Sequence, residues 1–337
     1  MTSFPSGFAA TILADSISPD GVRLTTVEAT FPRLILSELN THRILSKNSA
    51  SSRAIPVVRQ IRKIISSPFI PERIGSDKAG MQASRFLEGE ELAAAQKNVI
   101  IKRDRAIIGA LEDLVGRAYV AEVFGDDLSR IFREGFNDAD LSVVDAVLDF
   151  YSSAAKAKRL DENYELPEGF LNLHKQTLNR YLEPFMYHTA ILSGTDWSNF
   201  FALRAHENAQ PEIEVIARLI RGAMENSTPE PLAYGEWHLP FVQPEEKSLI
   251  TPENVEDWKL ISSGRTARVS YETHDGKRDI QKDVSLATGL IADGHMSPFE
   301  HIATPVSSEE KRDLGNFKGW LQMRKEIPFE SDYSLKA

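Results

Sequence analysis

The chain of 337 residues contains no cysteine, and this limits what the chain can fold into more than any other feature of its composition. Disulfide frames, Cys-ligated zinc sites, iron–sulfur clusters and thiolate nucleophiles are all excluded. The fold therefore depends on an apolar core, for which the 42% hydrophobic content is sufficient. Because the length is at the upper end of what one domain holds, we expect a single large domain with insertions over residues 1–337, with two closely packed domains as the alternative.

The formal net charge of −10 argues against a protein that coats a long nucleic acid by bulk electrostatics. No apolar run is long enough to span a membrane, and residues 1–20 carry no basic residue ahead of an apolar stretch. We therefore expect a cytoplasmic protein with no membrane partner. Residues 31–63 nevertheless contain seven Lys and Arg against the single acid Glu38, so this segment could hold a small anion.

Hydrophobic periodicity predicts a strand over residues 22–32, a helix over 34–45 and a further helix beginning at Pro56. Residues 66–170 are predicted to form an inserted helical layer, within which residues 119–142 lack a regular pattern. The first half of the chain is therefore expected to combine one early strand with many helices.

The helical pattern returns over residues 173–224, with a break at 193–195. Residues 240–252 contain three prolines and are the best candidate for a linker between elements. A last unit follows, with a helix over 279–292 that is closed by Gly294.

The densest polar cluster is residues 41–53, THRILSKNSASSR. Small hydroxylated residues allow the backbone to approach an anion closely, and Arg53 can hold a phosphate with two parallel N–H bonds. This pattern predicts a phosphate site. The alternative is a Ser-rich loop that caps the helix at Pro56 and exposes its basic residues to solvent. Composition leaves both interpretations open.

A second cluster places Arg180, Asn199 and Arg204 among aromatic and aliphatic residues. Charge is costly in such surroundings unless it is paired, so a buried ligand with acceptor atoms would explain the two arginines. The alternative is that they bond backbone carbonyls or the carboxylates of Glu183 and Glu212.

The third cluster is residues 294–301, GHMSPFEH. His295, Glu300 and His301 could ligate a metal ion, which keeps a zinc hydrolase as an alternative. The two histidines are six residues apart across a proline, and no further ligand is placed near them by the sequence. A structural histidine is therefore the competing interpretation.

Residues 41–53 resemble the signature of the flavin-dependent thymidylate synthases, which runs Arg-His-Arg, two residues, Ser, one residue, Asn-Glu, one residue, Ser, one residue, Arg. Thr41 replaces the first arginine and Ser49 replaces the glutamate, while six positions match: His42, Arg43, Ser46, Asn48, Ser51 and Arg53. Four further segments are similar to segments of that family: RYLEP at 180–184, SNFFALRAHENAQPEIE at 198–214, ARVSY at 267–271 and GHMSPFEH at 294–301.

The order of these segments differs from that of the family, in which the GHxSPFEH block precedes the His-Arg motif. The chain is therefore similar to a circularly permuted member, with residues 66–170 as a helical insertion and 263–328 as the displaced flavin-site block. The resemblance implies an α+β fold with a small, mostly antiparallel sheet and a large helical layer. It further implies that residues 294–301 lie against the helix carrying His42, and that the tail 316–328 is a helical piece at the rim of the same site.

The resemblance also implies a role for each matching position. FAD contacts are expected from Thr41, His42, Arg43, Ser49, Asn199, His295 and Ser297. Substrate contacts are expected from Glu38, Ser51, Ser52, Arg53, Arg180, Arg204 and Gln322. Among these, Arg204 is the expected catalytic residue, because its guanidinium would polarise the pyrimidine ring.

The absence of cysteine agrees with this resemblance, because ordinary thymidylate synthases use a cysteine to activate C6 whereas a reduced flavin avoids that requirement. The implied reaction is FAD-dependent C5 methylation of a pyrimidine nucleotide, dUMP to dTMP, with methylenetetrahydrofolate and NADPH as co-substrates. The family also implies a homotetramer with shared active sites. Divergent members are often phage-encoded, which would place the protein in the host cytoplasm. The alternatives are modification of dCMP or UMP, a flavin-free nucleotide-binding protein, and a metal hydrolase.

Overall fold

The computed structural model describes residues 7–49, 51–52, 55–77, 79, 83, 85–270, 277–309 and 311–332. The fold is of the mixed α+β class with a small, mostly antiparallel sheet, as expected. The chain divides into two compact units, which differs from the expected single domain. We call them the sheet unit (Met1–Phe31, Ile35–Ala50 and His188–Ala337) and the helical unit (Pro32–Leu34 and Ser51–Tyr187).

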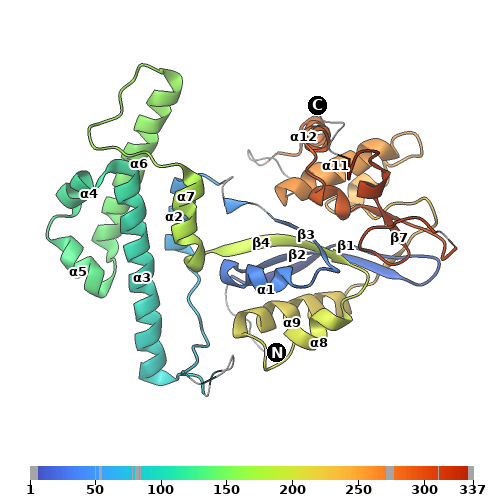
Figure 1. Cartoon of the computed structure of the whole chain (residues 1–337), viewed down its shortest axis with the longest axis horizontal. Helices are drawn as coiled ribbons and strands as arrows, with labels where there is room; N and C mark the ends of the chain where they lie inside the picture. The colour runs from blue at the N-terminus through green and yellow to red at the C-terminus, as the bar shows by residue number, and fades with distance from the viewer. Residues whose placement is uncertain are drawn as a thin grey trace. The chain divides into compact units, whose positions relative to one another are not determined.

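The five-stranded sheet has the order β3-β4-β2-β1-β5 (Figure 1). Its strands are β1 (Ala9–Ile17), β2 (Arg23–Pro32), β3 (Ser46–Ser49), β4 (Tyr187–Gly194) and β5 (Glu230–Pro231). The pairs β1–β2 and β3–β4 are antiparallel, whereas β5 runs parallel to β1. The strand expected over residues 22–32 is therefore confirmed as β2.

One face of the sheet is apolar and carries the core of the sheet unit. Because side chains alternate along a strand, Val27, Ala29 and Phe31 of β2 share this face. Helices α8 (Ser198–Arg204) and α9 (Pro211–Glu225) cover it, as Figure 1 shows. Their contacts include the buried residues Phe200, Ile213, Ile216, Ala217 and Ile220.

The opposite face of the sheet is shaped by a β-bulge in β1. Ile12 pairs with Val27 but Ala14 pairs with Thr26, so β1 contains one extra residue between these two pairs. One extra residue turns the following side chains to the other side of the sheet. The bulge therefore moves Ser16 away from the apolar face and onto the same face as Thr26.

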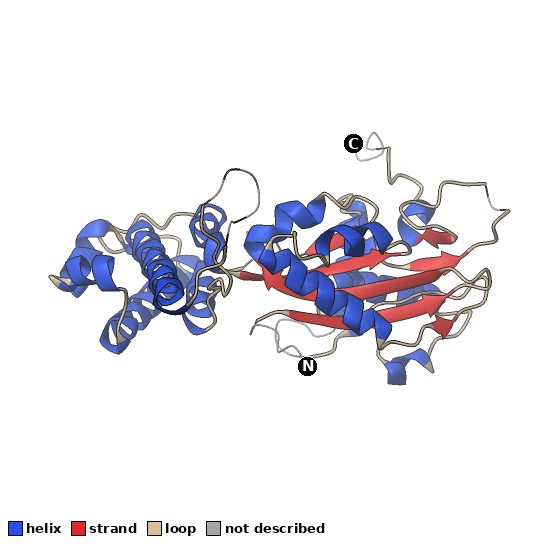
Figure 2. Cartoon of the chain, turned by 90° about the horizontal axis from the view of Figure 1, so that it is seen from below, coloured by secondary structure: helices blue, strands red, loops and turns tan. Residues whose placement is uncertain are grey.

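The C-terminal part of the sheet unit is built from short elements (Figure 2). They are α10 (Pro244–Lys247), α11 (Val255–Arg268), α12 (Ile280–Ala292), η4 (Ser297–Glu300), β6 (Ala303–Pro305), β7 (Trp320–Gln322) and η5 (Met323–Glu326). The helix predicted over 279–292 is confirmed, with the Asp279 side chain accepting from the backbone N–H of Lys282. The linker expected at 240–252 contains α10.

The tail expected to be helical over residues 316–328 is a strand followed by a 3-10 turn. Trp320 and Gln322 pair with Pro305 and Ala303, so the backbone of this segment is committed to the antiparallel β6–β7 pair. Its helix-like spacing of apolar residues was outweighed by this tertiary pairing.

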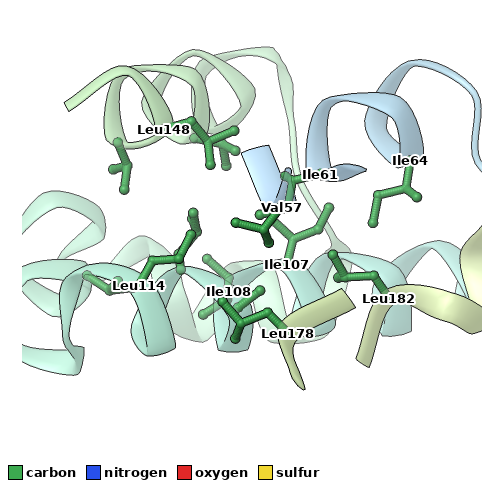
Figure 3. Packing of buried hydrophobic residues seen from close by; sticks show 14 of the residues in the cluster. Val57, Ile61, Ile64, Ile107, Ile108, Leu114, Leu148, Leu178 and Leu182 are labelled. Atoms are coloured by element: carbon green, nitrogen blue, oxygen red, sulfur yellow. The ribbon is translucent and has the colours of Figure 1, made fainter. Parts of the chain in front are cut away.

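The helical unit contains α2 (Val57–Ser66), α3 (Gly89–Val115), α4 (Arg117–Phe124), α5 (Asp127–Glu134), α6 (Asp138–Leu160), α7 (Lys175–Leu182) and η3 (Glu183–Phe185). Figure 3 shows its core, in which Ile61 of α2, Ile107 of α3 and Leu178 of α7 are buried together. The unit extends beyond the expected insertion 66–170 at both ends.

Three further expectations about secondary structure were wrong. The helical pattern over residues 173–224 is interrupted by the strand β4. Residues 119–142 looked irregular but are mostly helical, because α4 and α5 are bounded by glycines with positive φ at 116, 125 and 135. The helix predicted over 34–45 is limited to η1 (Arg33–Ile35) and α1 (Leu36–Asn40), after which a turn leads into β3. Among the helices that the structure describes, none is long and apolar enough to cross a membrane.

Candidate functional site

Residues from two of the sequence motifs meet at the C-terminal end of α8. Arg204, the last residue of that helix, donates from Nε to Nε2 of His42 at 2.8 Å. Its Nη2 donates to the hydroxyl of Thr41 at 3.2 Å. Because Arg204 makes no other hydrogen bond to the described residues, further N–H donors of its guanidinium remain available to a ligand.

His42 is held as a neutral acceptor in this arrangement. Its side chain is buried, and the edge of its ring meets the Phe200 ring at 89° with centroids 5.1 Å apart. Burial lowers the pKa of His42, and the nearby charges of Arg204 and Lys47 lower it further. A neutral imidazole whose Nε2 accepts from Arg204 fixes the orientation of the guanidinium.

The turn that carries His42 is closed by Lys47. The Lys47 Nζ donates to the carbonyl of His42 at 2.6 Å and to that of Leu45 at 2.8 Å. Partial burial lowers the pKa of Lys47, while the charge of Glu300 acts in the opposite direction. The Lys47 ammonium therefore stabilises this turn.

The C-terminal block reaches the same segment through Asn48 of β3. Its Nδ2 donates to the carbonyl of Thr266 at 2.8 Å, and its Oδ1 accepts from the hydroxyl of Ser297 at 3.1 Å. Both α11 and η4 pack against β3. Residues 294–301 therefore lie beside β3, which follows the His42 turn, whereas the expected neighbour was the helix that carries His42.

Gln322 does not lie at an open rim as expected. It is 1% exposed, and its Nε2 donates to the hydroxyl of Ser46 at 2.9 Å and to the carbonyl of Glu300 at 2.6 Å. Its Oε1 accepts from the backbone N–H of Asn316 at 2.9 Å. The Gln322 amide therefore holds the tail against β3. The expectation that Gln322 binds the substrate was wrong.

The other expected residues of the sheet unit make no side-chain hydrogen bond to Arg204 among the contacts described. The side chains of Arg43, Asn199, His295 and Ser297 are exposed, and those of Glu38 and Ser49 are half-buried. Asn199 lies in the first turn of α8, and a spacing of five residues places it about 140° around the helix from Arg204. Asn199 and Arg204 therefore face different directions.

The expected phosphate-binding residues belong to the helical unit. Ser52 is buried and its hydroxyl donates to Glu183 at 2.9 Å, while Arg180 contacts the same carboxylate at 3.2 Å. Arg180 therefore pairs with the Glu183 carboxylate, which was the alternative to a buried ligand in the sequence analysis. Ser51 is exposed, and Arg53 lies outside the described residues.

Asn179 supports this loop and was not singled out from the sequence. It is fully buried, and its Nδ2 donates to the carbonyls of Ser52 at 2.6 Å and of Ile55 at 2.9 Å. Its position directly before Arg180 gives no local signal for this role, which depends on the approach of α7 to the start of α2.

A second polar arrangement, also missed from the sequence, crosses the interior of the sheet unit. We call it the buried relay, a chain of five hydrogen-bonded side chains in the order His301, Ser193, Thr26, His238 and Ser16. The contacts are 2.7 Å, 2.6 Å, 2.8 Å and 2.8 Å in that order. All five residues are buried, and Ser16 also lines a cavity of about 460 Å³ beside β5.

The two histidines of the relay are neutral. Burial, the largest cause in both cases, lowers the pKa of His238 and that of His301 to about 3. His301 Nε2 is buried without a hydrogen-bond partner among the described residues, as is the hydroxyl of Thr266. Both atoms belong to residues of the C-terminal block that contacts β3.

The geometry does not favour the metal-hydrolase alternative. Glu300 is paired with Arg324, His301 Nδ1 is bonded to Ser193, and His295 points to the surface. Across the described parts of the chain, no group of three or more His, Asp or Glu side chains is arranged to hold a metal ion.

The centre around Arg204 offers the guanidinium of Arg204, the hydroxyl of Thr41 and the imidazole of His42. Such a donor set can bind carbonyl oxygens and anions. Comparisons of the chain with protein-family models, with curated proteins and with solved structures return no match.

Proposed function

We propose that the protein is a flavin-dependent enzyme, of the thymidylate synthase type, that methylates C5 of a pyrimidine nucleotide, with dUMP as the substrate. Methylenetetrahydrofolate would donate the carbon and NADPH the electrons. The observation that carries the proposal is the meeting of motifs far apart in sequence. Arg204 contacts His42 across 162 residues, and Ser297 contacts Asn48 across 249 residues.

Three of the segments that resemble the family converge on Asn48. The strand β3 supplies Asn48 itself, α11 supplies the Thr266 carbonyl next to the ARVSY segment, and η4 supplies Ser297 of the GHMSPFEH segment. A chance resemblance in one segment would give no reason for the others to fold beside it. This convergence supports a circularly permuted thymidylate synthase-like fold.

The groups at this centre fit a flavin. The exposed Arg43 and His295 and the hydroxyl of Ser297 are donors suited to a pyrophosphate and to ring carbonyl oxygens. The orphaned Nε2 of His301 and the orphaned hydroxyl of Thr266 are further polar atoms close to the Asn48 junction. When bound, the flavin would supply the redox chemistry that the side chains lack.

The role proposed for Arg204 follows from its position. With Nε fixed by His42, the guanidinium can direct its remaining donors at a pyrimidine carbonyl and the neighbouring ring nitrogen. A fixed positive group at that place would stabilise an electron-rich, enolate-like form of the ring, in which negative charge lies on the carbonyl oxygen and C5 is nucleophilic toward the carbon donor. Thr41 restricts the same guanidinium from the other side.

The proposal keeps Ser51, Arg53 and Arg180 as contacts for the substrate phosphate. The Ser52 hydroxyl is committed to Glu183, so Ser52 would contribute its backbone N–H. Glu38, half-buried beside the Thr41 turn, is kept as a contact for the ring. The proposal also includes a homotetramer with shared active sites. Light scattering on the purified protein would measure the number of chains in the assembly.

The function is tested by the absorbance spectrum and by product analysis. The purified protein should be yellow or should take up FAD, and the bound flavin should bleach on addition of NADPH. Incubation with methylenetetrahydrofolate, NADPH and each of dUMP, UMP and dCMP, followed by mass spectrometry, should give a methylated product from dUMP. A protein that binds dUMP but neither FAD nor folate would instead be a flavin-free nucleotide-binding protein, and a product from dCMP or UMP alone would change the substrate.

A further inference from the structure

The helical unit contains a cavity of about 530 Å³ that has no part in the proposed methylation. It lies between the start of α2, the C-terminal third of α6 and the residues around the start of α7. Pockets that hold small organic molecules are about 300–1,000 Å³ in volume. The cavity is therefore of a size that fits such a molecule, and none of its lining residues belongs to the candidate site.

The Lys, Arg and His residues that line the cavity are Lys158 and Arg159 from α6 and His174 and Lys175 at the start of α7, and no Asp or Glu is among the described lining residues. The acids nearest in sequence to Lys158 and Arg159 are Asp161 and Glu162, just beyond the end of α6, and neither lines the cavity. Asp145 and Asp149 of α6 pair with Arg62 and do not line it either. In a chain of net charge −10, a cavity with only positive groups is unusual.

The charges of Lys158 and Arg159 are not neutralised by a carboxylate among the described residues. Lys158 Nζ donates to the carbonyl of Glu162 at 2.5 Å, and Arg159 Nε donates to the carbonyl of Ala155 at 3.2 Å. These carbonyls orient the two side chains but carry no net charge. The cavity therefore keeps a positive potential that attracts an anion.

The wall beside these cations is apolar and fixed. The Tyr151 ring stacks on Phe170 with an interplanar angle of 21°, and its hydroxyl donates to Asn172 at 2.8 Å. Tyr151, Leu173 and Val58 all line the cavity. A bound molecule would therefore meet cationic groups at one side and an aromatic and aliphatic surface at the other.

From this combination we infer that the cavity binds a phosphorylated small molecule that carries a ring, of the size of a nucleotide. Lys158 and Arg159 would hold the phosphates through charge-assisted hydrogen bonds, and Tyr151 and Leu173 would contact the ring. The site goes beyond the proposed function, because it would act as a second anion site in a unit that the thymidylate synthase resemblance does not explain.

The test uses the fluorescent nucleotide TNP-ATP on the full-length protein. Loss of two charge-assisted contacts in Lys158→Ala/Arg159→Ala should weaken binding at least about 30-fold. Lys156→Ala is the matched control, because Lys156 is exposed on the same helix but does not line the cavity, and it should bind within about two-fold of the wild type. Thermal unfolding of both variants should match the wild type, since all three side chains are exposed.

Competition experiments distinguish recognition of the phosphates from recognition of the ring. ATP should displace the probe at lower concentration than tripolyphosphate, and adenosine should not displace it. Arg180→Ala, which removes a proposed contact to the substrate phosphate at a residue that does not line the cavity, should leave probe binding unchanged, and this distinguishes the cavity from the methylation site. The inference is overturned if the probe does not saturate, if the double variant binds as tightly as the Lys156→Ala control, if tripolyphosphate competes as well as ATP, or if Arg180→Ala abolishes binding.

Discussion

The guanidinium of Arg204 is positioned by the neutral imidazole of His42, which accepts its hydrogen bond. Burial keeps His42 unprotonated, so its Nε2 is free to accept from Arg204. A protonated His42 would repel the guanidinium and lose its acceptor. The pair can therefore direct the remaining N–H donors of Arg204 only while His42 stays neutral.

Arg204→Lys should reduce dUMP methylation by at least about 100-fold, because a single ammonium cannot both bond His42 and contact two ring atoms. Flavin absorbance and the dUMP dissociation constant should change little. The measurement is steady-state turnover together with a flavin spectrum. Arg221→Lys on α9, a surface residue in a loose pair with Glu225, is the control and should retain full activity. Equal turnover in the two variants would remove Arg204 from the catalytic role.

At the scale of single residues, the resemblance assigned His42 and Arg204 to one site, and the two side chains are in contact, whereas the burial of Gln322 was not predicted. The burial of Gln322 depends on its bond to Ser46, 276 residues away, and on the pairing of β7 with β6. Nothing local to the sequence encodes either contact, so an interior amide was mistaken for a ligand-binding one.

At the scale of elements, a strand with alternating polar and apolar residues was easier to predict than a strand with a continuous apolar run. The segment that forms β2 alternates loosely and was predicted. The segment of β4, YHTAILSG, is buried over most of its length, so its apolar run resembled part of a helix. The bulge in β1 that turns Ser16 toward His238 also has no local signal, and the buried relay could not be predicted without it.

Three short helices of the C-terminal part are joined by one buried charge cluster. Arg265 of α11 is fully buried, and it bonds Glu246 of α10 through both Nη atoms, at 2.6 Å and 2.8 Å. Its Nε donates to Asp283 of α12 at 2.9 Å, and Asp283 also bonds Arg268. The elements that carry the displaced block are therefore held together by charges that are largely buried.

Arg265→Met should lower the free energy of unfolding by about 3–5 kcal/mol, because it leaves the buried carboxylate of Glu246 without its partner. Urea unfolding followed by circular dichroism measures this change. Arg278→Met removes an exposed pair with Glu245 on the same part of the chain and should cost less than about 1 kcal/mol. Similar losses in both variants would mean that the buried cluster contributes no more than a surface pair.

At the scale of the whole chain, the order of the motifs predicted a contact that no local pattern could. Permutation implied that residues 294–301 lie beside the His42 segment, and the bonds of Ser297 to Asn48 and of His301 to Ser193 agree with it. Length allowed one domain or two, but the boundary between the units was not predicted, because the main segment of the helical unit begins inside the polar cluster at Ser51 rather than at the end of α2. The resemblance therefore predicted contacts between distant segments more accurately than it predicted the boundaries of the two units.

Global stability should fall as the pH is lowered below neutrality, because the two relay histidines resist protonation. Their pKa is about 3 in the folded chain, against an ordinary value of about 6.5 when unfolded. Between these values the unfolded chain binds protons that the folded chain does not, so stability present above pH 6.5 is lost progressively toward pH 3. For His238 and His301 together the loss from pH 7 to pH 5 is about 4 kcal/mol. His42, whose pKa is also lowered by burial, acts in the same direction.

His238→Gln isolates one part of this effect, since a glutamine amide can still bond Ser16 and Thr26 but does not titrate. Urea unfolding of the wild type and the variant at pH 7 and pH 5 should show the variant losing about 2 kcal/mol less than the wild type over that interval. Carboxylates whose pKa is lowered titrate below this range and cancel in the comparison. His206→Gln, at an exposed position, should keep the wild-type dependence. If His238→Gln also kept the full wild-type dependence on pH, His238 would have to be protonated in the folded chain, and the relay could not hold it as a neutral hydrogen-bonded ring.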